Sequence, residues 1–267
     1  MDLTSLGYRT DLALLQLGGT QVEDRGDHLV IRSPHNPTFW WGNFLLLSRV
    51  PPREDTDLWL DRFAAEFPDA EHLAFGFDGT DGRVADLAAF TDRGMHCEAS
   101  TVLSASVVHD PPRPNHQATY RQLISDDDWA RSVALRVACN DDQDDARHLE
   151  FTRLRAATNR ALTEAGRGGW FGAFVDERLL SQMGLVAASP GLARFQSVET
   201  HPDARGQGLA GTLIQHVSRY GFGELGAATL VMVADPDYSA IRLYRSVGFA
   251  DGESQLQAEK PPATASS

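Results

Sequence analysis

The stretch from Phe195 to Thr212 constrains this chain most, because it joins a strand to a helix through a proline turn and closely spaced glycines. Residues 195–200 are typical of a strand, and residues 206–222 of a helix. The apolar side chains that would share one face of this helix are Leu209, Leu213, Ile214 and Val217. Glycines at such a turn let backbone N–H groups approach an anion, and a helix N-terminus adds unpaired donors. The stretch therefore predicts a phosphate-binding loop.

One pattern in this loop fits a dinucleotide fingerprint. It is Gly206-x-Gly208-x-x-Gly211, followed by Asp235 at the end of the next apolar strand. However, a dinucleotide loop leaves its strand almost directly into the first glycine, whereas here residues 200–205 intervene. Such a domain also needs several further βα units, and only about one helix and one short strand fit after Asp235. A dehydrogenase is therefore the least favoured interpretation.

A second pattern fits better. Arg205-x-x-Gly208-x-Ala210 matches the [Q/R]-x-x-G-x-[G/A] loop of one large family, and residues 240–249 match its A-x-x-L-Y-x-x-x-G-F segment. In this order and at this spacing, the two motifs resemble the GNAT superfamily of N-acetyltransferases. The antiparallel strands expected before the loop, at 170–175, 179–188 and 193–200, also follow the order of that fold.

The chain is long enough for two small domains, and a proline-rich segment at residues 109–115 marks the expected boundary. Three prolines within residues 111–114 favour a stiff extended connection. We predict a first domain at 1–115, a catalytic GNAT domain at 116–260 and a flexible tail at 261–267. The fold class is α/β with a mixed α+β sheet, as two GNAT-like domains in tandem.

The elements expected in the second domain begin with a strand at 118–124 and a helix capped by Ser125. A second helix follows at 145–165, after an acidic stretch at 140–145 that is interpreted as a loop. After the phosphate loop and its helix come an apolar strand at 228–234, a helix at 239–247 and a short closing strand.

The first domain alternates strands and helices but lacks a phosphate loop. The strands are expected at 28–33, 39–47, 72–77 and 98–105, and the helices at 55–67 and 84–92. After residues 45–50 the chain continues Pro-Pro-Arg-Glu-Asp, without a glycine. Two interpretations stand: a degenerate GNAT domain that binds no coenzyme A, or an unrelated αβ cap. Trp40 and Trp41 are neighbours on the expected strand and would face opposite ways, so only one of them need be buried.

Charge and composition exclude several classes of function. The net charge is −13, with 9 basic and 18 acidic residues in 1–115 against 15 and 19 in 116–267. Such a surface repels nucleic acid and anionic membranes and attracts small cations. The two cysteines and the absence of a signal-like or membrane-spanning run favour a cytoplasmic protein. The histidines show no metal-ligand spacing, so we expect no metal site.

The resemblance also implies an acetyl-CoA site. Backbone groups of Val198 and Thr200 would pair with the pantetheine arm, and the loop amides would hold the diphosphate. The implied contact residues are Val198, Thr200, Arg205, Gly206, Gln207, Gly208, Leu209, Ala210 and Asp237. Asp237 departs from the asparagine usual in the family, and an anion there suits a phosphate-bearing ligand poorly.

Acetyl transfer to an amine needs a general acid for the leaving thiolate and a base for the amine. By resemblance, Tyr244 is the acid and Glu199 the base, with His201 as runner-up because its unperturbed pKa suits proton transfer near neutrality. The expected acceptor is a primary amine of a small molecule. The alternatives are a non-catalytic acyl-CoA-binding regulator and, less favoured, a protein N-terminal acetyltransferase.

Overall fold

The computed structural model describes residues 1–140 and 146–262, and within the helix that starts at 146 it describes side chains from His148 onward. Most of the predicted acidic loop and tail, residues 141–145 and 263–267, lies outside the described part. Contacts divide the chain into two compact units. Unit 1 comprises residues 1–102, 234–236 and 252–267, and unit 2 comprises 103–233 and 237–251. Neither unit is one continuous segment, whereas the sequence predicts a single boundary at 115.

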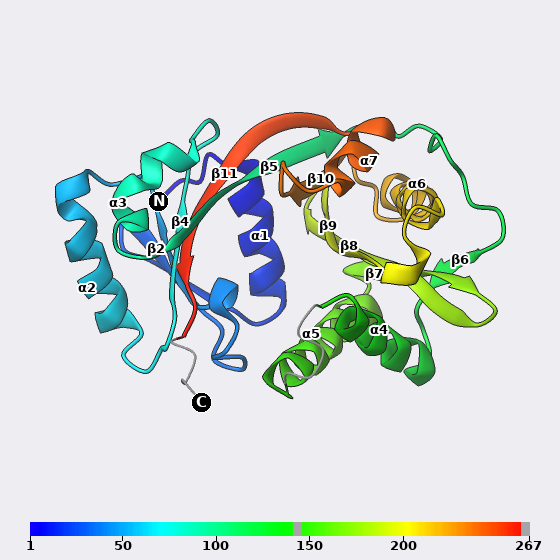
Figure 1. Cartoon of the computed structure of the whole chain (residues 1–267), viewed down its shortest axis with the longest axis horizontal. Coiled ribbons are helices and arrows are strands. Elements are labelled where there is room, and N and C mark those ends of the chain that lie inside the picture. Colours follow the sequence, from blue (N-terminus) through cyan, green and yellow to red (C-terminus); the bar gives the residue numbers. More distant parts are fainter. Residues whose placement is uncertain (141–145, 263–267) are drawn as a thin grey trace. The chain divides into compact units, whose positions relative to one another are not determined.

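Unit 1 is a mixed sheet with helices on both faces (Figure 1). Its elements are α1 (Leu6–Leu17), β1 (Gln21–Asp24), β2 (His28–Arg32), η1 (Trp40–Gly42), β3 (Phe44–Leu47), η2 (Arg53–Asp55), α2 (Thr56–Glu66), β4 (Leu73–Phe77), η3 (Val84–Leu87), α3 (Ala88–Thr91), β5 (His96–Ala105) and β11 (Ala250–Lys260). The strand order is β1-β2-β3-β4-β11-β5.

Alternating strand residues build the two cores of unit 1. Leu45 and Leu47 of β3 pack with Phe63 of α2 on one face. Leu46, between them in sequence, packs with Tyr8 and other residues of α1 on the opposite face. This alternation follows from the two-residue period of a strand.

Two features of unit 1 differ from the prediction. The pattern did not predict α1, which begins after Ser5, whose side chain accepts a hydrogen bond from the backbone N–H of Tyr8. The apolar run at 39–47 is also not one strand. Residues 40–42 form a 3₁₀ turn, and Trp40 and Trp41 are both half-buried, so the prediction that they sit on opposite faces of a strand was wrong.

Unit 2 contains the predicted antiparallel strands and the glycine loop. Its elements are β6 (Thr119–Gln122), α4 (Asp126–Ala138), α5 (Ala146–Glu164), β7 (Gly168–Val175), β8 (Arg178–Ser189), β9 (Leu192–Thr200), η4 (Pro202–Ala204), α6 (Leu209–Gly223), β10 (Thr229–Ala234) and α7 (Ala240–Ser246). The strand order is β10-β9-β8-β7-β6. Among the described strands of this order, β6 to β9 pair antiparallel, and β9 and β10 pair parallel. This order excludes the dinucleotide fold, whose strands are mostly parallel.

Helices cover both faces of the unit 2 sheet, with α4 and α5 on one side and α6 on the other (Figure 1). On β8, Gln182 donates a hydrogen bond to a backbone carbonyl of α4, while the nearby Leu185 lies against Gly221 of α6. The predicted cap of α4 is confirmed, since the Ser125 side chain accepts from the N–H of Asp128 at 3.1 Å.

The last strand is the main correction to the predicted organisation. The sequence predicts a short strand that completes the second domain, but β11 spans eleven residues and pairs antiparallel with β4 of unit 1. Leu256 and Ala258 are the buried positions of this ladder. The strand pattern is hidden by the polar residues Ser254, Gln255 and Gln257, whose side chains donate hydrogen bonds to residues far away in the sequence.

Candidate active site

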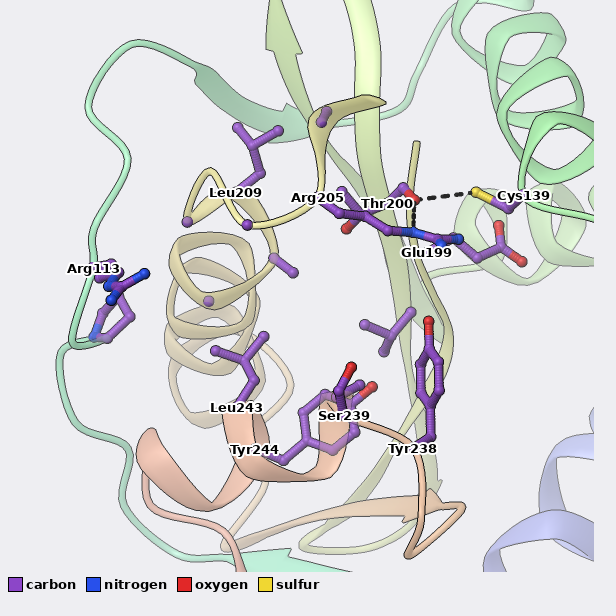
Figure 2. A pocket seen from close by; sticks show the side chains of 18 of the residues that line it. Arg113, Cys139, Glu199, Thr200, Arg205, Leu209, Tyr238, Ser239, Leu243 and Tyr244 are labelled. Atoms are coloured by element: carbon purple, nitrogen blue, oxygen red, sulfur yellow. Dashed lines mark hydrogen bonds between the residues drawn. The ribbon is translucent and has the colours of Figure 1, made fainter. Parts of the chain in front are cut away.

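A pocket of about 600 Å³ lies within unit 2, between the end of β9, the start of α6 and the start of α7 (Figure 2). Its walls come from four parts of the chain: the proline-rich segment, the end of α4 with the start of α5, the β9–α6 connection, and residues 238–246. The size is that of an ordinary small-molecule site. Both predicted catalytic residues, Glu199 and Tyr244, line it.

The separation of β9 from β10 forms one wall of this pocket. The described strands pair at Leu192, Ala193 and Arg194 of β9, and no register pair joins them beyond that point, although β9 continues to Thr200. A bulge at Ser197, whose φ is +50°, bends β9 where its register with β8 shifts. Parallel strands that separate leave backbone groups facing the gap, as a bound extended chain requires.

The glycine loop closes one end of the pocket. Gly206 and Gly208 have φ values of +75° and +80°, and Gly208 is the N-cap of α6. A Cβ at Gly206 would meet no atom within 4 Å, so this glycine faces open space. A Cβ at Gly208 would lie 2.2 Å from the carbonyl oxygen of Arg113. A side chain at Gly208 would therefore collide with the backbone of the proline-rich segment rather than extend into the pocket.

Most of the predicted ligand-contacting residues line the pocket. These are Val198, Thr200, Arg205, Gly206, Gly208, Leu209 and Ala210. Gln207 and Asp237 are not among the lining residues. The Gln207 side chain instead donates a hydrogen bond to the carbonyl of Asp203, at 3.1 Å.

The side chain of Arg205 is turned away from the glycine loop, toward the end of β9 (Figure 2). Its Nε donates to the Thr200 carbonyl oxygen at 3.3 Å, and the Cys139 thiol donates to the same oxygen at 3.4 Å. Burial and the charge of Glu199 raise the pKa of the Cys139 thiol. This cysteine therefore stays a neutral hydrogen-bond donor rather than a thiolate.

Tyr244 is buried on α7, with 6% of its surface exposed. Burial, together with the charge that Tyr238 would carry when ionised, raises the pKa of the Tyr244 phenol to about 12. The group is therefore protonated throughout the physiological range, which is the state that a proton donor needs. Tyr238, more than half exposed, lies beside it in the pocket wall (Figure 2).

Glu199 is held by two donors. Arg136 Nη1 lies 2.7 Å from one carboxylate oxygen, and Gln182 Nε2 lies 2.7 Å from the other. The same Arg136 nitrogen also donates to the Ser197 hydroxyl oxygen at 3.1 Å. His201 does not line the pocket, and its Nδ1 accepts from the N–H of Asp203 at 3.3 Å.

The sequence did not point to several residues of the pocket wall, among them Arg113, Arg136, Cys139, His148 and Tyr238. Arg136 is the last-turn arginine of α4, and it meets Glu199 only because α4 packs on the strands. Among the described residues, no group of three or more metal-ligating side chains has the geometry to hold an ion. The described part of the chain contains no helix that is both long and apolar enough to cross a membrane.

An acyltransferase-type site is defined by three features together: the antiparallel strands, the parallel pair that separates, and the glycine loop at the start of α6. Residues 129–249 match the model of the Acetyltransferase (GNAT) family. This part of the chain is a GNAT acetyltransferase domain, and the predicted family is confirmed.

Solved structures support the fold over the whole chain. A functionally unknown conserved protein from Staphylococcus epidermidis ATCC 12228 aligns with a TM-score of 0.72 at 12% identity, covering 90% of this chain and 93% of that one. A GCN5-related N-acetyltransferase from Kribbella flavida aligns at 0.65 and 15% identity, covering 98% of both chains. A tandem GNAT protein from the clavulanic acid biosynthesis pathway aligns at 0.57 and 15% identity, covering 95% and 89%. No curated protein matches the chain.

Proposed function

We propose that this protein is an N-acetyltransferase that moves an acetyl group from acetyl-CoA to a primary amine of a small molecule. The observation that carries the proposal is the opening between β9 and β10, which lies beside the N-terminus of α6 and in the same pocket as the Tyr244 phenol. An extended ligand with an anionic end fits these three features together.

The residues present suit an acyl-CoA. A diphosphate fits the open space at Gly206. The first N–H groups of α6 have no partner within the helix, and a helix N-terminus stabilises an anion. Val198 and Thr200 present the edge of β9 to the pocket, where an extended amide-bearing arm would pair. When bound, acyl-CoA supplies the thioester that the amine attacks.

Tyr244 is the proposed general acid. Burial raises its pKa to about 12, so the phenol carries its proton at physiological pH and would donate it to the leaving thiolate. Its burial on α7 also fixes the position of the ring, so that little reorganisation is needed during transfer.

Glu199 is the proposed general base, acting directly or through a water molecule. Its contacts with Arg136 and Gln182 fix the carboxylate in the pocket wall at the end of β9. Both carboxylate oxygens of Glu199 already accept hydrogen bonds, so we favour proton removal through a water molecule.

Unit 1 is proposed to bind no cofactor. Its parallel strands β3 and β4 stay paired from Leu45 to Leu47, and the N–H of Asp78 continues the ladder by donating to the Leu47 carbonyl at 2.8 Å. The buried side chains of Phe75 and Phe77 fill the neighbouring core. Unit 1 therefore lacks, in the described strands, the opening that β9 and β10 form.

A transfer assay tests the function. The full chain is incubated with acetyl-CoA and a panel of small primary amines, and acetylated products are measured by mass spectrometry, with Tyr244→Phe as the matched control. A product whose yield falls in the variant supports the proposal. Binding of acetyl-CoA without product on any amine would favour the non-catalytic regulator. Acetylation of peptide N-termini alone would favour a protein acetyltransferase.

A further inference from the structure

Residues 110–115, here called the proline strap, run along α6 and are fixed to it at several points. The Asp110 carboxylate accepts a hydrogen bond from Gln215, one turn before Arg219 on the helix. Pro111 lies against Gly211, where an added Cβ would be 3.1 Å away. At the other end, the backbone N–H of Asn115 donates to the Thr212 hydroxyl at 2.9 Å.

Asn115 also ties the strap to the glycine loop itself. Its side-chain Nδ2 donates to the Gln207 carbonyl oxygen at 2.9 Å. Between these anchors, the carbonyl of Arg113 crosses so close to Gly208 that no side chain fits there. The position of Arg113 relative to the loop is therefore fixed by contacts on both sides of it.

The Arg113 side chain is exposed and lines the pocket, and it forms no ion pair within the described part of the chain. In the view of Figure 2, Arg113 and Arg205 lie on opposite sides of α6. The Arg205 side chain donates a hydrogen bond to the Thr200 carbonyl, so its guanidinium lies at the end of β9 rather than at the glycine loop.

Two positive groups belong to this pocket. The N-terminus of α6 carries a partial positive charge, and Arg113, which lines the same pocket, carries a full one. The nearby carboxylate of Asp110 is engaged by Gln215 and lies 3.8 Å from Arg219. A phosphate bound on the open side of the loop, where Gly206 has no atom within 4 Å of an added Cβ, would interact favourably with the helix N-terminus and with an arginine side chain that reaches over from the strap.

We propose that Arg113 is a further binding residue for the acyl-CoA, contacting the diphosphate from the strap while the loop amides hold it from the helix. The inference rests on the proposed function. It assigns to the segment before β6 a direct part in ligand binding, although the sequence indicates only a connection between domains.

Calorimetric titration of the full chain with acetyl-CoA tests this inference, using Arg113→Ala, Arg113→Lys and Arg178→Ala. Arg178 is an exposed arginine at the β7–β8 hairpin, outside the pocket lining, so its variant removes the same charge elsewhere in unit 2. Arg113→Ala should weaken binding about tenfold, or about 1.4 kcal/mol. Arg113→Lys should recover part of the loss, and Arg178→Ala should bind like the wild type. The difference between wild type and Arg113→Ala should shrink as salt is raised.

Three outcomes of this titration would overturn the role of Arg113. Equal affinity of wild type and Arg113→Ala overturns the role of Arg113 and leaves the proposed function intact. Equal losses in Arg113→Ala and Arg178→Ala show only a general charge effect and also overturn it. Failure of the wild type to bind acetyl-CoA overturns the proposed function and this inference together.

Discussion

Gly208→Ala tests how the strap and the loop depend on each other. A residue with a side chain in the left-handed conformation costs about 1–2 kcal/mol, and the φ of Gly208 is +80°. The new Cβ would also lie 2.2 Å from the Arg113 carbonyl oxygen, so the strap must move aside. That movement weakens the two hydrogen bonds that Asn115 donates to Thr212 and Gln207. Each such bond contributes about 0.5–1.5 kcal/mol to the free energy of unfolding.

The expected destabilisation by Gly208→Ala is therefore roughly 2–5 kcal/mol. Gly206→Ala is the matched control, because φ is +75° there but no atom lies within 4 Å of the added Cβ. It should cost only the backbone strain, about 1–2 kcal/mol. Urea denaturation followed by circular dichroism measures both free energies of unfolding. If Gly208→Ala destabilises the protein no more than Gly206→Ala, the strap does not press on the loop and the reasoning fails.

Two further predictions concern the proposed catalytic groups. Tyr244→Phe should lower kcat by about 10²–10⁴ while the affinity for acetyl-CoA stays near normal, and unchanged turnover would remove Tyr244 from the mechanism. Tyr244→Phe should also change the pH dependence of stability. The pKa of the Tyr244 phenol is near 10.0 in the unfolded chain and about 12 in the folded one, so the free energy of unfolding of the wild type should fall as pH rises from 10 to 12. Tyr244→Phe should lose less of its free energy of unfolding over this range. Glu199→Gln should lower kcat by about 10²–10⁴, whereas a change confined to KM would show that Glu199 only lines the pocket wall.

The sequence predicted the parts of unit 2 that depend on local rules. Gly206 and Gly208 both adopt positive φ, which glycine does without strain. The presence of glycine at these positions is enough to indicate such a turn. The turn between the expected strands 170–175 and 179–188 falls at Asp176 and Glu177, and both residues have positive φ. The strand, loop and helix therefore follow from short-range chemistry.

Features that depend on distant residues were not predictable from local patterns. Strand β11 carries alternating polar residues that hydrogen bond to partners far away in the sequence, such as Gln255 with Asp11. Helix α1 begins where the Asp78 carboxylate accepts from the N–H groups of Thr4 and Ser5. Neither partner can be identified from the residues next to the element itself.

The same limit applies to the candidate site. Arg136 and Glu199 are separated by 63 positions, and only the packing of α4 on the sheet brings them together. Arg113 stands in a proline run that indicates a connection, and its place beside Gly208 appears only once the strap is folded along α6. Motif spacing therefore identified the loop and Tyr244 but not the side chains that complete the pocket.

The location and number of acyl-CoA sites test the central claim most directly. Titration calorimetry of the full chain with acetyl-CoA, combined with amide hydrogen exchange, measures both. We predict one site per chain, with protection concentrated at residues 198–211 and no change at residues 44–56 of unit 1. Two sites per chain, protection in 44–56, or no binding at all would contradict the assignment of unit 2 as the acyl-CoA-binding domain.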